Sequence, residues 1–454
     1  MKVLLVNPFQ VEYVHKKGRI YNRTWTPLDL AYCSAMLERH GIQADILDAN
    51  ADQIGPEGVA QRARGYDKVF LTSTSLDRWQ CPHLDLNPFF KTVAAVRAVA
   101  PEVYVMGSHG TVKPAEMLEE TNADAIVRGE PEYTVEEICA GRPMAQIRGI
   151  TWRNNGEVIH NPDQLPVKMD DLPLPSFEKL PMKHYKYEVL GDHFTLFEMT
   201  RGCASKCTFC LLKTYGTGVR KKSVETLARE VEHAITHYGI KTAYFIDLEF
   251  TVLRKQVVEF CEWLIRKRFD FTWCCQTRLD LVDDELLGLM KRAGCRLIHA
   301  GVEAGSDEIL AITDKRITMK QIEQGMKLVH SHGIETACFF MMGFPESGHD
   351  EMDRIVRFAK RLNPTYALFH IAAPYPGTKL HEQVKNDPNL RFSDGSLFPE
   401  AIEGRFTLPE LKAMTRSAYL GYYLRPSYVA ARLAKGQFRP LLSQFQLFLN
   451  FVRS

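Results

Sequence analysis

Short apolar segments alternate with amphipathic segments along most of the 454-residue chain. In the first 145 residues the pattern predicts strands at 2–7, 44–47, 68–72, 103–106 and 125–127. It predicts helices between them at 27–40, 55–64, 87–100, 114–121 and 132–140. Apolar strands separated by amphipathic helices indicate a parallel sheet that is covered on both faces. We therefore expect an α/β, doubly wound, Rossmann-like domain whose ligand lies beyond the carboxyl ends of the strands.

A second strand–helix series follows between about residues 194 and 375. Strands are predicted at 195–199, 242–246, 270–274, 296–301, 335–340 and 367–372. Helices are predicted at 223–238, 254–268, 283–293, 306–312, 319–332 and 351–362. Six such units predict a partial (β/α)6 barrel with its chemistry at the carboxyl ends of the strands.

The segments around the barrel differ in character. Residues 146–190 contain several prolines and a small hairpin signal at 150–160, which predicts a linker. The chain after residue 391 predicts a small helical region. The expected domains are therefore 1–145, 146–190, 191–390 and 391–454. The apolar segments 429–435 and 440–451 carry basic neighbours, and we favour their docking on the barrel over a membrane surface.

The composition narrows the function classes. With 57 Lys+Arg against 55 Asp+Glu the net charge is +2, and 45% of the residues are hydrophobic. These values disfavour a disordered chain and give no support to nucleic-acid binding. No secretory signal is visible and no run of about 20 apolar residues occurs. The eleven cysteines are an odd number. Together these features predict a cytoplasmic protein without a disulfide framework.

Three cysteines form the most specific motif of the chain. Cys203, Cys207 and Cys210 follow a predicted strand with the spacing C-x3-C-x2-C. Three thiolates on one compact loop suit three irons of a 4Fe–4S cluster and leave the fourth iron open. A zinc site remains an alternative, with a fourth ligand from His184, His193 or a distant cysteine. Three neighbouring cysteines cannot all pair as disulfides.

Polar residues and glycines recur where the predicted barrel strands end. A carboxylate among small residues suits ribose hydroxyls or a cationic amine, and a guanidinium suits a carboxylate. A structural salt bridge at the rim is the alternative explanation for each. The candidates after the successive strands are Asp247, Glu249, Gln276, Arg278, Glu303, Gly343 and Tyr375.

Hydroxyl residues and glycines also follow the predicted strands of the first region. The hydroxyl run from Thr72 to Ser75 suits hydrogen bonds to a large polar cofactor, although ordinary turns explain it equally well. Glycines at 107 and 110 permit close approach of a ligand to the backbone. No G-x-G-x-x-G follows the first strand, so a dinucleotide site is not expected.

The cysteine motif is identified as that of the radical-SAM superfamily. The resemblance implies that the open iron binds S-adenosylmethionine and that reduction of the cluster cleaves it to a 5′-deoxyadenosyl radical. Phe209 matches the aromatic position beside the adenine. The implied contacts with S-adenosylmethionine are Phe209, Asp247, Glu249, Gln276, Arg278, Glu303 and Gly343.

The first region resembles cobalamin-binding domains fused to radical-SAM enzymes. The resemblance rests on residues 6–8, 26–31, 106–110 and 127–132. The implied cobalamin contacts are Asn7, Thr72, Ser73, Thr74, Leu76, Arg78, Trp79, Gly107, Ser108, His109, Gly110, Gly129 and Glu130.

The lower cobalt ligand departs from one common pattern. Cobalamin domains with a His ligand carry D-x-H-x-x-G, whereas the nearest match, residues 13–18, has Tyr13 in place of the Asp. We therefore expect no His ligand on cobalt, and a lower face shielded by the loop 76–79. His15 and His109 remain the alternatives, with His109 expected in a turn at the corrin edge.

The resemblance covers nearly the whole chain. It includes the branch with the anaerobic magnesium-protoporphyrin ester cyclase, hopanoid-pathway radical-SAM proteins and cobalamin-dependent methyltransferases. The favoured function is methylation of an unactivated carbon of a small, bulky hydrophobic metabolite through methylcobalamin. A radical cyclase or rearrangement enzyme is the alternative. A tRNA methylthiotransferase and a non-enzymatic cobalamin sensor are remote.

The same resemblance implies an electron donor such as flavodoxin or ferredoxin. Tyr375 and Tyr422 are the catalytic candidates. The eight remaining cysteines are predicted to be buried thiols, with Cys81, on the loop near the expected corrin, as the one functional candidate.

Overall fold

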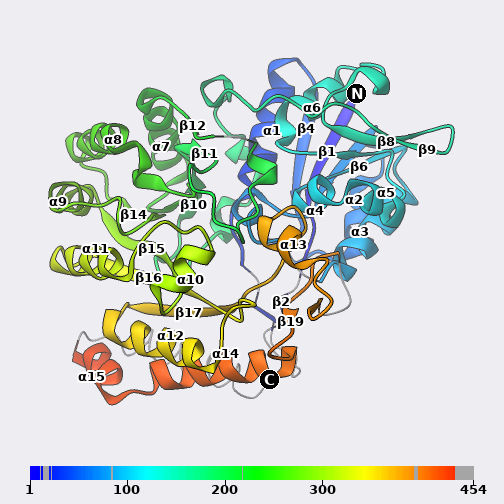
Figure 1. The fold of residues 1–454 in the computed structure, drawn as a ribbon. Coiled ribbons are helices and arrows are strands. Elements are labelled where there is room, and N and C mark those ends of the chain that lie inside the picture. The colour runs from blue at the N-terminus through cyan, green and yellow to red at the C-terminus, as the bar shows by residue number, and fades with distance from the viewer. Residues whose placement is uncertain are drawn as a thin grey trace.

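A computed structural model describes residues 1–10, 12–13, 20–21, 23–82, 85–216, 218–392 and 397–434 (Figure 1). Its first sheet has the order β4-β1-β5-β6-β7-β8-β9. The strands are β1 Lys2–Asn7, β4 Gln43–Asp48, β5 Lys68–Thr72, β6 Glu102–Met106, β7 Ala125–Val127, β8 Ile150–Asn154 and β9 Glu157–His160. The first five are parallel, as predicted. The hairpin β8–β9, which the sequence places in a linker, pairs antiparallel with β7 and extends this sheet.

Helices cover both faces of the first sheet. They are α1 Leu28–Arg39, α2 Pro56–Ala63, α3 Asn87–Arg97, α4 Ser108–Val112, α5 Pro114–Thr121 and α6 Pro131–Cys139. Apolar residues of α2, α3 and α5 pack on one face, and those of α1 and α6 on the other. This arrangement confirms the doubly wound prediction. The chain leaves β1 first towards β4 and then towards β5, so the topological switch point lies between β1 and β5.

One local prediction in this domain is wrong. Residues 107–110 were expected to form a turn, but α4 begins at Ser108 directly after Gly107. Gly107 has φ +107°, and a Cβ there would lie 2.7 Å from the hydroxyl of Ser73. The glycine therefore allows the chain to reverse tightly enough to start a helix at once.

The second sheet contains six parallel strands in the order β10-β13-β14-β15-β16-β17. The strands are β10 Phe194–Phe197, β13 Thr242–Phe245, β14 Thr272–Gln276, β15 Cys295–Glu303, β16 Glu335–Met342 and β17 Tyr366–Ile371. The helices of this domain are α7 Val224–Tyr238, α8 Arg254–Lys267, α9 Asp284–Arg292, α10 Asp307–Ile312, α11 Met319–Ser331 and α12 His349–Leu362. The edge strands β10 and β17 do not pair in the described chain, which confirms a partial barrel.

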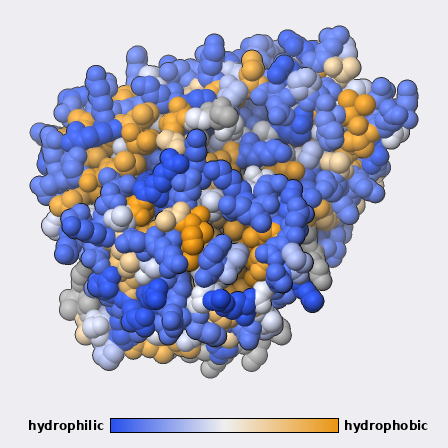
Figure 2. Space-filling model, in the orientation of Figure 1, coloured by the Kyte–Doolittle hydropathy of each residue, from blue (hydrophilic) through white to orange (hydrophobic). Residues whose placement is uncertain are grey.

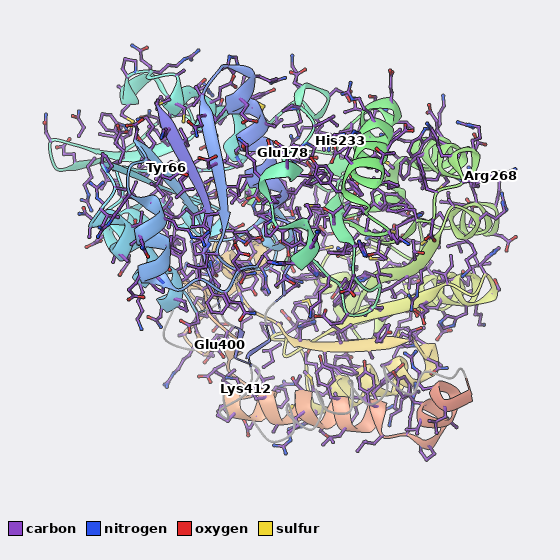
Figure 3. All side chains as sticks on the ribbon, turned by 180° about the vertical axis from the view of Figure 1, so that it is seen from behind. Tyr66, Glu178, His233, Arg268, Glu400 and Lys412 are labelled. Carbon is purple, nitrogen blue, oxygen red and sulfur yellow. The ribbon has the colours of Figure 1, made fainter. Side chains whose placement is uncertain are left out.

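Short elements complete the chain. They are β2 Glu12–Tyr13, β3 Ile20–Tyr21, β11 Thr200–Arg201, β12 Arg220–Lys221, β18 Arg391–Phe392, β19 Ile402–Glu403, α13 Lys379–Val384, α14 Leu408–Tyr423 and α15 Pro426–Ala434. Lys412 of α14 points towards Glu400, with which it forms an ion pair at 2.9 Å (Figure 3).

The open edge of β17 is covered by α14. The hydroxyl of Tyr423 accepts a hydrogen bond from Ala367 N at 3.0 Å, and that of Tyr419 accepts one from Phe369 N at 3.1 Å. Backbone groups at an exposed edge would otherwise be available for pairing with another chain. In α15 the hydroxyl of Tyr428 donates to the carbonyl oxygen of Thr365 at 3.0 Å, so this helix is docked on the barrel, as predicted for the segment 429–435. Residues 435 and 440–451 lie outside the described residues.

One buried apolar cluster joins the first domain to the barrel. Trp25, Tyr32 and Trp79 from the first domain belong to the same buried cluster as Phe197 and Tyr244 of the barrel. The face shown in Figure 2 is mainly hydrophilic, with scattered small apolar areas. No helix within the described ranges combines the length and the apolar character of a membrane span. The predicted buried thiols are confirmed at Cys33, Cys139, Cys261, Cys274, Cys275, Cys295 and Cys338, whereas Cys81 is exposed.

Candidate active site between the two domains

The cysteine loop begins directly after β11. Gly202 has φ +87°, and a Cβ there would lie 2.0 Å from the carbonyl oxygen of Gly218, so only glycine fits. The thiols of Cys203, Cys207 and Cys210 are half-buried and none is in a disulfide. Burial raises the pKa of Cys203 to about 11 and also raises the pKa of each of the other two. Binding of iron to these thiols must therefore release protons.

Asp247, which follows β13, supports the start of this loop. Its buried carboxylate accepts hydrogen bonds from Met199 N at 3.1 Å, from Thr200 N at 2.5 Å and from Thr200 Oγ1 at 2.6 Å. Burial raises the pKa of Asp247 to about 6, although these hydrogen bonds oppose the shift. The structure thus places this predicted S-adenosylmethionine contact beneath the loop, with its oxygens already engaged.

Glu249 and Arg278 meet beside the cysteine loop. Ser205 Oγ, between Cys203 and Cys207, donates to Glu249 Oε1 at 2.6 Å, and Arg278 Nε lies 4.0 Å from the same oxygen. Arg278 also donates to Asp280 at 2.9 Å and 3.0 Å and to the carbonyl oxygen of Lys315 at 2.6 Å. The predicted pair is therefore brought together, and Arg278 is held firmly in place.

Glu303 ends β15 with φ +67°. Lys315, which the sequence did not single out, donates to Glu303 Oε1 at 2.9 Å. Gly301 makes room for this pair, because a Cβ there would lie 2.1 Å from Glu303 Oε1. The pair is buried, so Lys315 compensates the charge of Glu303.

The other barrel candidates surround the same region. Phe209 packs against Phe344, with ring centroids 5.8 Å apart. Gln276 Oε1 accepts a hydrogen bond from Tyr244 at 3.4 Å. Gly343 has φ +87°, and a Cβ there would lie 2.7 Å from Leu411 of α14.

A polar cavity lies at the switch point of the first sheet. It is lined by Asn7, Pro8, Gln10, Arg23, Trp25, Asn50, Thr74, Ser75, Asp77 and Arg78. Three of the predicted cobalamin contacts, Asn7, Thr74 and Arg78, are in this lining. Among the described residues, buried Gln10 Oε1 and Trp25 Nε1 have no hydrogen-bond partner. Unpartnered buried polar atoms at a switch point can hydrogen-bond the polar groups of a ligand.

Other predicted cobalamin contacts hold the end of β5 against α4. Thr74 Oγ1 accepts a hydrogen bond from Ser108 N at 2.8 Å, and the hydroxyl of Thr72 donates to the carbonyl oxygen of Thr74 at 2.6 Å. Ser73 Oγ lies 3.0 Å from His109 Nδ1. The structure thus explains the hydroxyl run as the connection between β5 and α4.

His109 does not occupy the corrin-edge turn that was expected. It is fully buried in α4, bonded to Ser73 and packed edge-on against Phe398 with ring centroids 4.8 Å apart. Gly110 lies against Ile126, where a Cβ would approach to 2.5 Å. The other alternative ligand, His15, lies outside the described residues.

The residues of the loop 76–79, which is expected to shield cobalt, have two different surroundings. Leu76 and Trp79 are each 1% exposed and belong to the shared core. Trp79 packs against Tyr215 with ring centroids 5.3 Å apart. Only Arg78 of the three predicted residues lines the cavity.

Several contacts join the two sets of strand ends. Ser108 Oγ lies 3.2 Å from Thr214 Oγ1, shortly after the cysteines. The half-buried Tyr375 has its hydroxyl 3.9 Å from the Cys81 thiol. Tyr422, the second catalytic candidate, is fully buried, and its hydroxyl donates to the carbonyl oxygen of Pro364. Pro364 precedes β17, so Tyr422 lies at the end of the strand opposite to the site.

The loop after β7 also reaches the barrel. Gly129, with φ +75°, donates its N–H to Thr111 Oγ1 at 2.9 Å. Glu130 accepts a hydrogen bond from Arg220 of β12 at 2.9 Å and one from Val167 N at 2.8 Å. This predicted cobalamin contact is thus part of the contact between the domains.

The zinc alternative finds no support in the geometry. His184, one of its suggested ligands, is paired with Asp52 at 3.1 Å. Among the described residues, no group of three His, Cys, Asp or Glu side chains is arranged to hold a single metal ion. The donor set of three thiols on one loop fits an iron–sulfur cluster, whose thiolates each bind a different iron.

Comparison with known proteins gives a consistent result. Residues 197–359 match the model of the radical SAM superfamily, and residues 21–139 match that of the B12 binding domain. An uncharacterised methyltransferase of Pyrococcus horikoshii is 31% identical, covering 94% of this chain and 93% of its own. The anaerobic magnesium-protoporphyrin IX monomethyl ester cyclase of Rubrivivax gelatinosus is 26% identical over 85% of this chain and 70% of its own.

A solved structure has the same fold. The radical S-adenosylmethionine methyltransferase TsrM from Kitasatospora setae, with cobalamin and a [4Fe–4S] cluster bound, superposes with a TM-score of 0.69. The match covers 87% of this chain and 78% of TsrM at 18% sequence identity.

Proposed function

Because this chain belongs to the radical SAM superfamily and carries a B12-binding domain, we propose that it is a methyltransferase acting on an unactivated carbon of a small molecule. The cofactors of this cobalamin-dependent radical SAM enzyme are a 4Fe–4S cluster, S-adenosylmethionine and cobalamin. When bound, these groups supply a carbon radical and a transferable methyl group. The relative with 31% identity is named as a methyltransferase, which supports the choice of reaction.

One observation carries the proposal. The segments that follow the strands of the two domains are in direct contact, through Ser108–Thr214 and Cys81–Tyr375. A carbon activated on the barrel side must be reached by a methyl group from the cobalamin side before water intervenes. Facing strand ends are therefore what this reaction requires, and the shared apolar core excludes water around them.

The barrel residues would bind and orient S-adenosylmethionine. Cys203, Cys207 and Cys210 hold the cluster and leave one iron for the amino and carboxylate groups. Phe209 and Gly343 would flank the adenine. Gln276, Arg278 and Glu303 offer charged or hydrogen-bonding groups for the rest of the molecule, whereas Asp247 and Glu249 hold the loop itself.

The cobalamin side would use fewer residues than the sequence indicated. Asn7, Thr74 and Arg78 line the cavity and would contact the cofactor, and Ser108 holds Thr74 in place through a hydrogen bond. His109 is already bonded to Ser73. We therefore propose that cobalt has no His ligand. An EPR spectrum of the cob(II)alamin form that shows nitrogen hyperfine splitting from an axial ligand would refute this.

The remaining partners follow from the same chemistry. The cluster needs a one-electron donor, for which a flavodoxin or ferredoxin is suited. The substrate is proposed to be a bulky hydrophobic metabolite. The half-buried Phe339 and Met341 and the exposed His370, on neighbouring barrel strands, support an apolar and partly aromatic environment.

A radical cyclase that transfers no methyl group is the second candidate. It is favoured by the 26% identity to the magnesium-protoporphyrin ester cyclase over 85% of the chain. Both reactions use the same three cofactors, so the arrangement of the cysteine loop and cavity serves either one.

One experiment separates the two reactions. The anaerobically reconstituted enzyme is incubated with a reductant, methyl-labelled S-adenosylmethionine and candidate tetrapyrroles or lipids. Label in the product supports methyl transfer. Deoxyadenosine together with an altered but unlabelled product supports cyclisation, and would refute the methyltransferase proposal. A chain with Cys203, Cys207 and Cys210 changed to Ala is the control for non-enzymatic reaction.

A further inference from the structure

A buried ion cluster connects the cysteine loop to the first domain. We call the four residues Arg201, Glu130, Glu132 and Glu198 the Arg201 cluster. The side chain of Arg201 is 0% exposed, and its neighbour two positions on is Cys203. Its Nε donates to Glu198 at 2.9 Å, and its Nη2 donates to the same carboxylate at 2.8 Å. This bidentate pair fixes the plane of the guanidinium within the barrel domain.

The remaining carboxylates come from the other domain. Arg201 Nη2 lies 2.7 Å from Glu132 Oε1, as an ion pair outside hydrogen-bond geometry, and Nη1 lies 3.6 Å from Glu130 Oε2. Glu130 and Glu132 flank Pro131 at the first turn of α6, where the helix dipole favours negative charge. The guanidinium also lies 5.5 Å from the ring of Trp79, on the loop after β5.

Further charged residues stabilise the segments on either side of this contact. Arg220 of β12 binds Glu130, and β12 pairs with β11, which contains Arg201. Lys222 is fully buried and donates to Glu230 at 2.8 Å, while its own N–H donates to Met199 at 2.9 Å. Each charged group therefore has partners that are themselves anchored in a strand or a helix.

Because the Arg201 cluster is buried, it favours one docking of the two domains over others. A guanidinium removed from water must find compensating carboxylates, and here two of the three, Glu130 and Glu132, belong to the other domain. Only the observed docking of the two domains supplies Glu132 to Arg201. A displacement of α6 from the barrel would leave buried charges uncompensated on both sides.

We propose that Arg201 is a positioning residue that holds the cysteine loop in register with the cobalamin domain through Glu132. The consequence of this contact, a defined spacing between cluster and cobalamin, rests on the proposed function. The contact itself involves only side chains of this chain. It can therefore be tested without cofactors.

The first test measures amide hydrogen exchange in the full chain without cofactors. In Glu132→Gln, which keeps the volume but removes the charge, exchange should rise at least tenfold in the cysteine loop, residues 199–212, as well as in α6. Arg201→Lys keeps the positive charge but loses the bidentate geometry of the guanidinium. In this variant, exchange should rise in the same two segments. Glu38→Gln is the matched control, because Glu38 pairs with Lys179 away from the loop.

The outcomes are distinct. If Glu132→Gln changes exchange only in α6 and leaves the cysteine loop as in the wild type, the proposal is overturned. If Glu132→Gln does not fold, Arg201→Lys decides, since a rise confined to the cysteine loop would also overturn it. Failure of the chain to bind cobalamin would contradict the proposed function but would not affect this measurement.

The second test uses the reconstituted protein. Pulsed EPR measures the spin–spin distance between the reduced cluster and cob(II)alamin. The wild type and Glu38→Gln should give one narrow distribution, and Glu132→Gln should give a distribution at least twice as broad at equal iron and cobalt content. A distribution of wild-type width in Glu132→Gln would refute the positioning role, because a residue important only for stability would leave the spacing unchanged.

Discussion

Each of the two domains has a buried aspartate that accepts several hydrogen bonds near the end of a strand. Asp48 ends β4 in the first domain, and Asp247 follows β13 in the barrel. Burial raises the pKa of each to about 6, against the opposing effect of their hydrogen bonds. Their partners differ: within the described part of the chain, the hydrogen bonds to Asp247 come from Met199 and Thr200, which are adjacent in the chain.

Asp48 instead joins three separate segments. It accepts hydrogen bonds from Asn7 of β1 at 2.8 Å, from Ala51 N at 3.1 Å and from the hydroxyl of Tyr185 at 2.7 Å. The difference shows how the two sites are built. The proposed cluster site is one continuous loop whose start is held by Asp247. The cavity of the first domain is instead assembled from distant parts of the chain.

The largest effect expected from this comparison concerns the cysteines. Changing Cys203, Cys207 and Cys210 together to Ala should remove the cluster completely, because all its protein ligands lie on one loop. Cobalamin binding should persist at wild-type affinity, because no residue of the cavity lies on that loop. Iron content and the absorbance near 400 nm measure the first effect, and cobalamin titration the second. A full cluster in the triple variant would contradict the assignment.

A pair of glycines gives a more discriminating test. Gly202→Ala places a Cβ 2.0 Å from Gly218 O and should lower iron loading, while Gly107→Ala places one 2.7 Å from Ser73 and Thr74 and should lower cobalamin affinity. Strained backbone of this kind costs about 1–3 kcal/mol per residue.

Gly41→Ala is the matched control, since Gly41 has φ +70° but no atom within 4 Å of the added Cβ. It should lower the thermal stability slightly and leave both cofactors bound. If Gly107→Ala reduced iron loading as strongly as Gly202→Ala, the two sites would not be independent.

The aspartates predict a pH dependence with a definite sign. Because folding raises each pKa from 3.8 to about 6, the native state binds more protons than the unfolded state between these values. The contribution of each of these two groups to the free energy of unfolding should therefore fall by about 3 kcal/mol as pH rises from 4 to 6 and stay level above. Asp247→Asn and Asp48→Asn should each flatten the profile by that amount in urea unfolding. Asp29, whose pKa burial raises to about 8, continues the fall in both variants and in the wild type. Unchanged profiles in both variants would show that neither aspartate is the source.

The smallest expected effect tests the long-range contacts of Asp48. Tyr185→Phe removes one buried hydrogen bond and should destabilise the chain by about 1–2 kcal/mol. It should also weaken cobalamin binding, because Asp48 orients Asn7 in the cavity lining. Tyr66→Phe is the control: Tyr66 donates to Asp45 at 2.8 Å near the surface of the same domain (Figure 3). Equal losses of cobalamin affinity in both variants would argue against this role of Asp48.

The sequence predicted the barrel site better than the cavity. Cys203, Cys207, Cys210 and Arg278 were found because their spacing or their place after a strand is itself the signal. Arg201 and Lys222 were missed, since a charged residue near a strand is ordinarily exposed and nothing local shows that both are buried. The sequence left a core role open for Tyr422, and the structure shows this residue buried against Pro364, because the packing of α14 on β17 is a tertiary property.

The sequence by itself determined the two α/β units and the grouping of three cysteines on one loop, because alternation of apolar segments and close cysteine spacing are local properties. Only the tertiary structure decided that His109 is buried, that Glu130 and Glu132 face Arg201, and which hydroxyls line the cavity. These outcomes depend on how two domains dock, and docking is set by the summed burial of residues far apart in the chain.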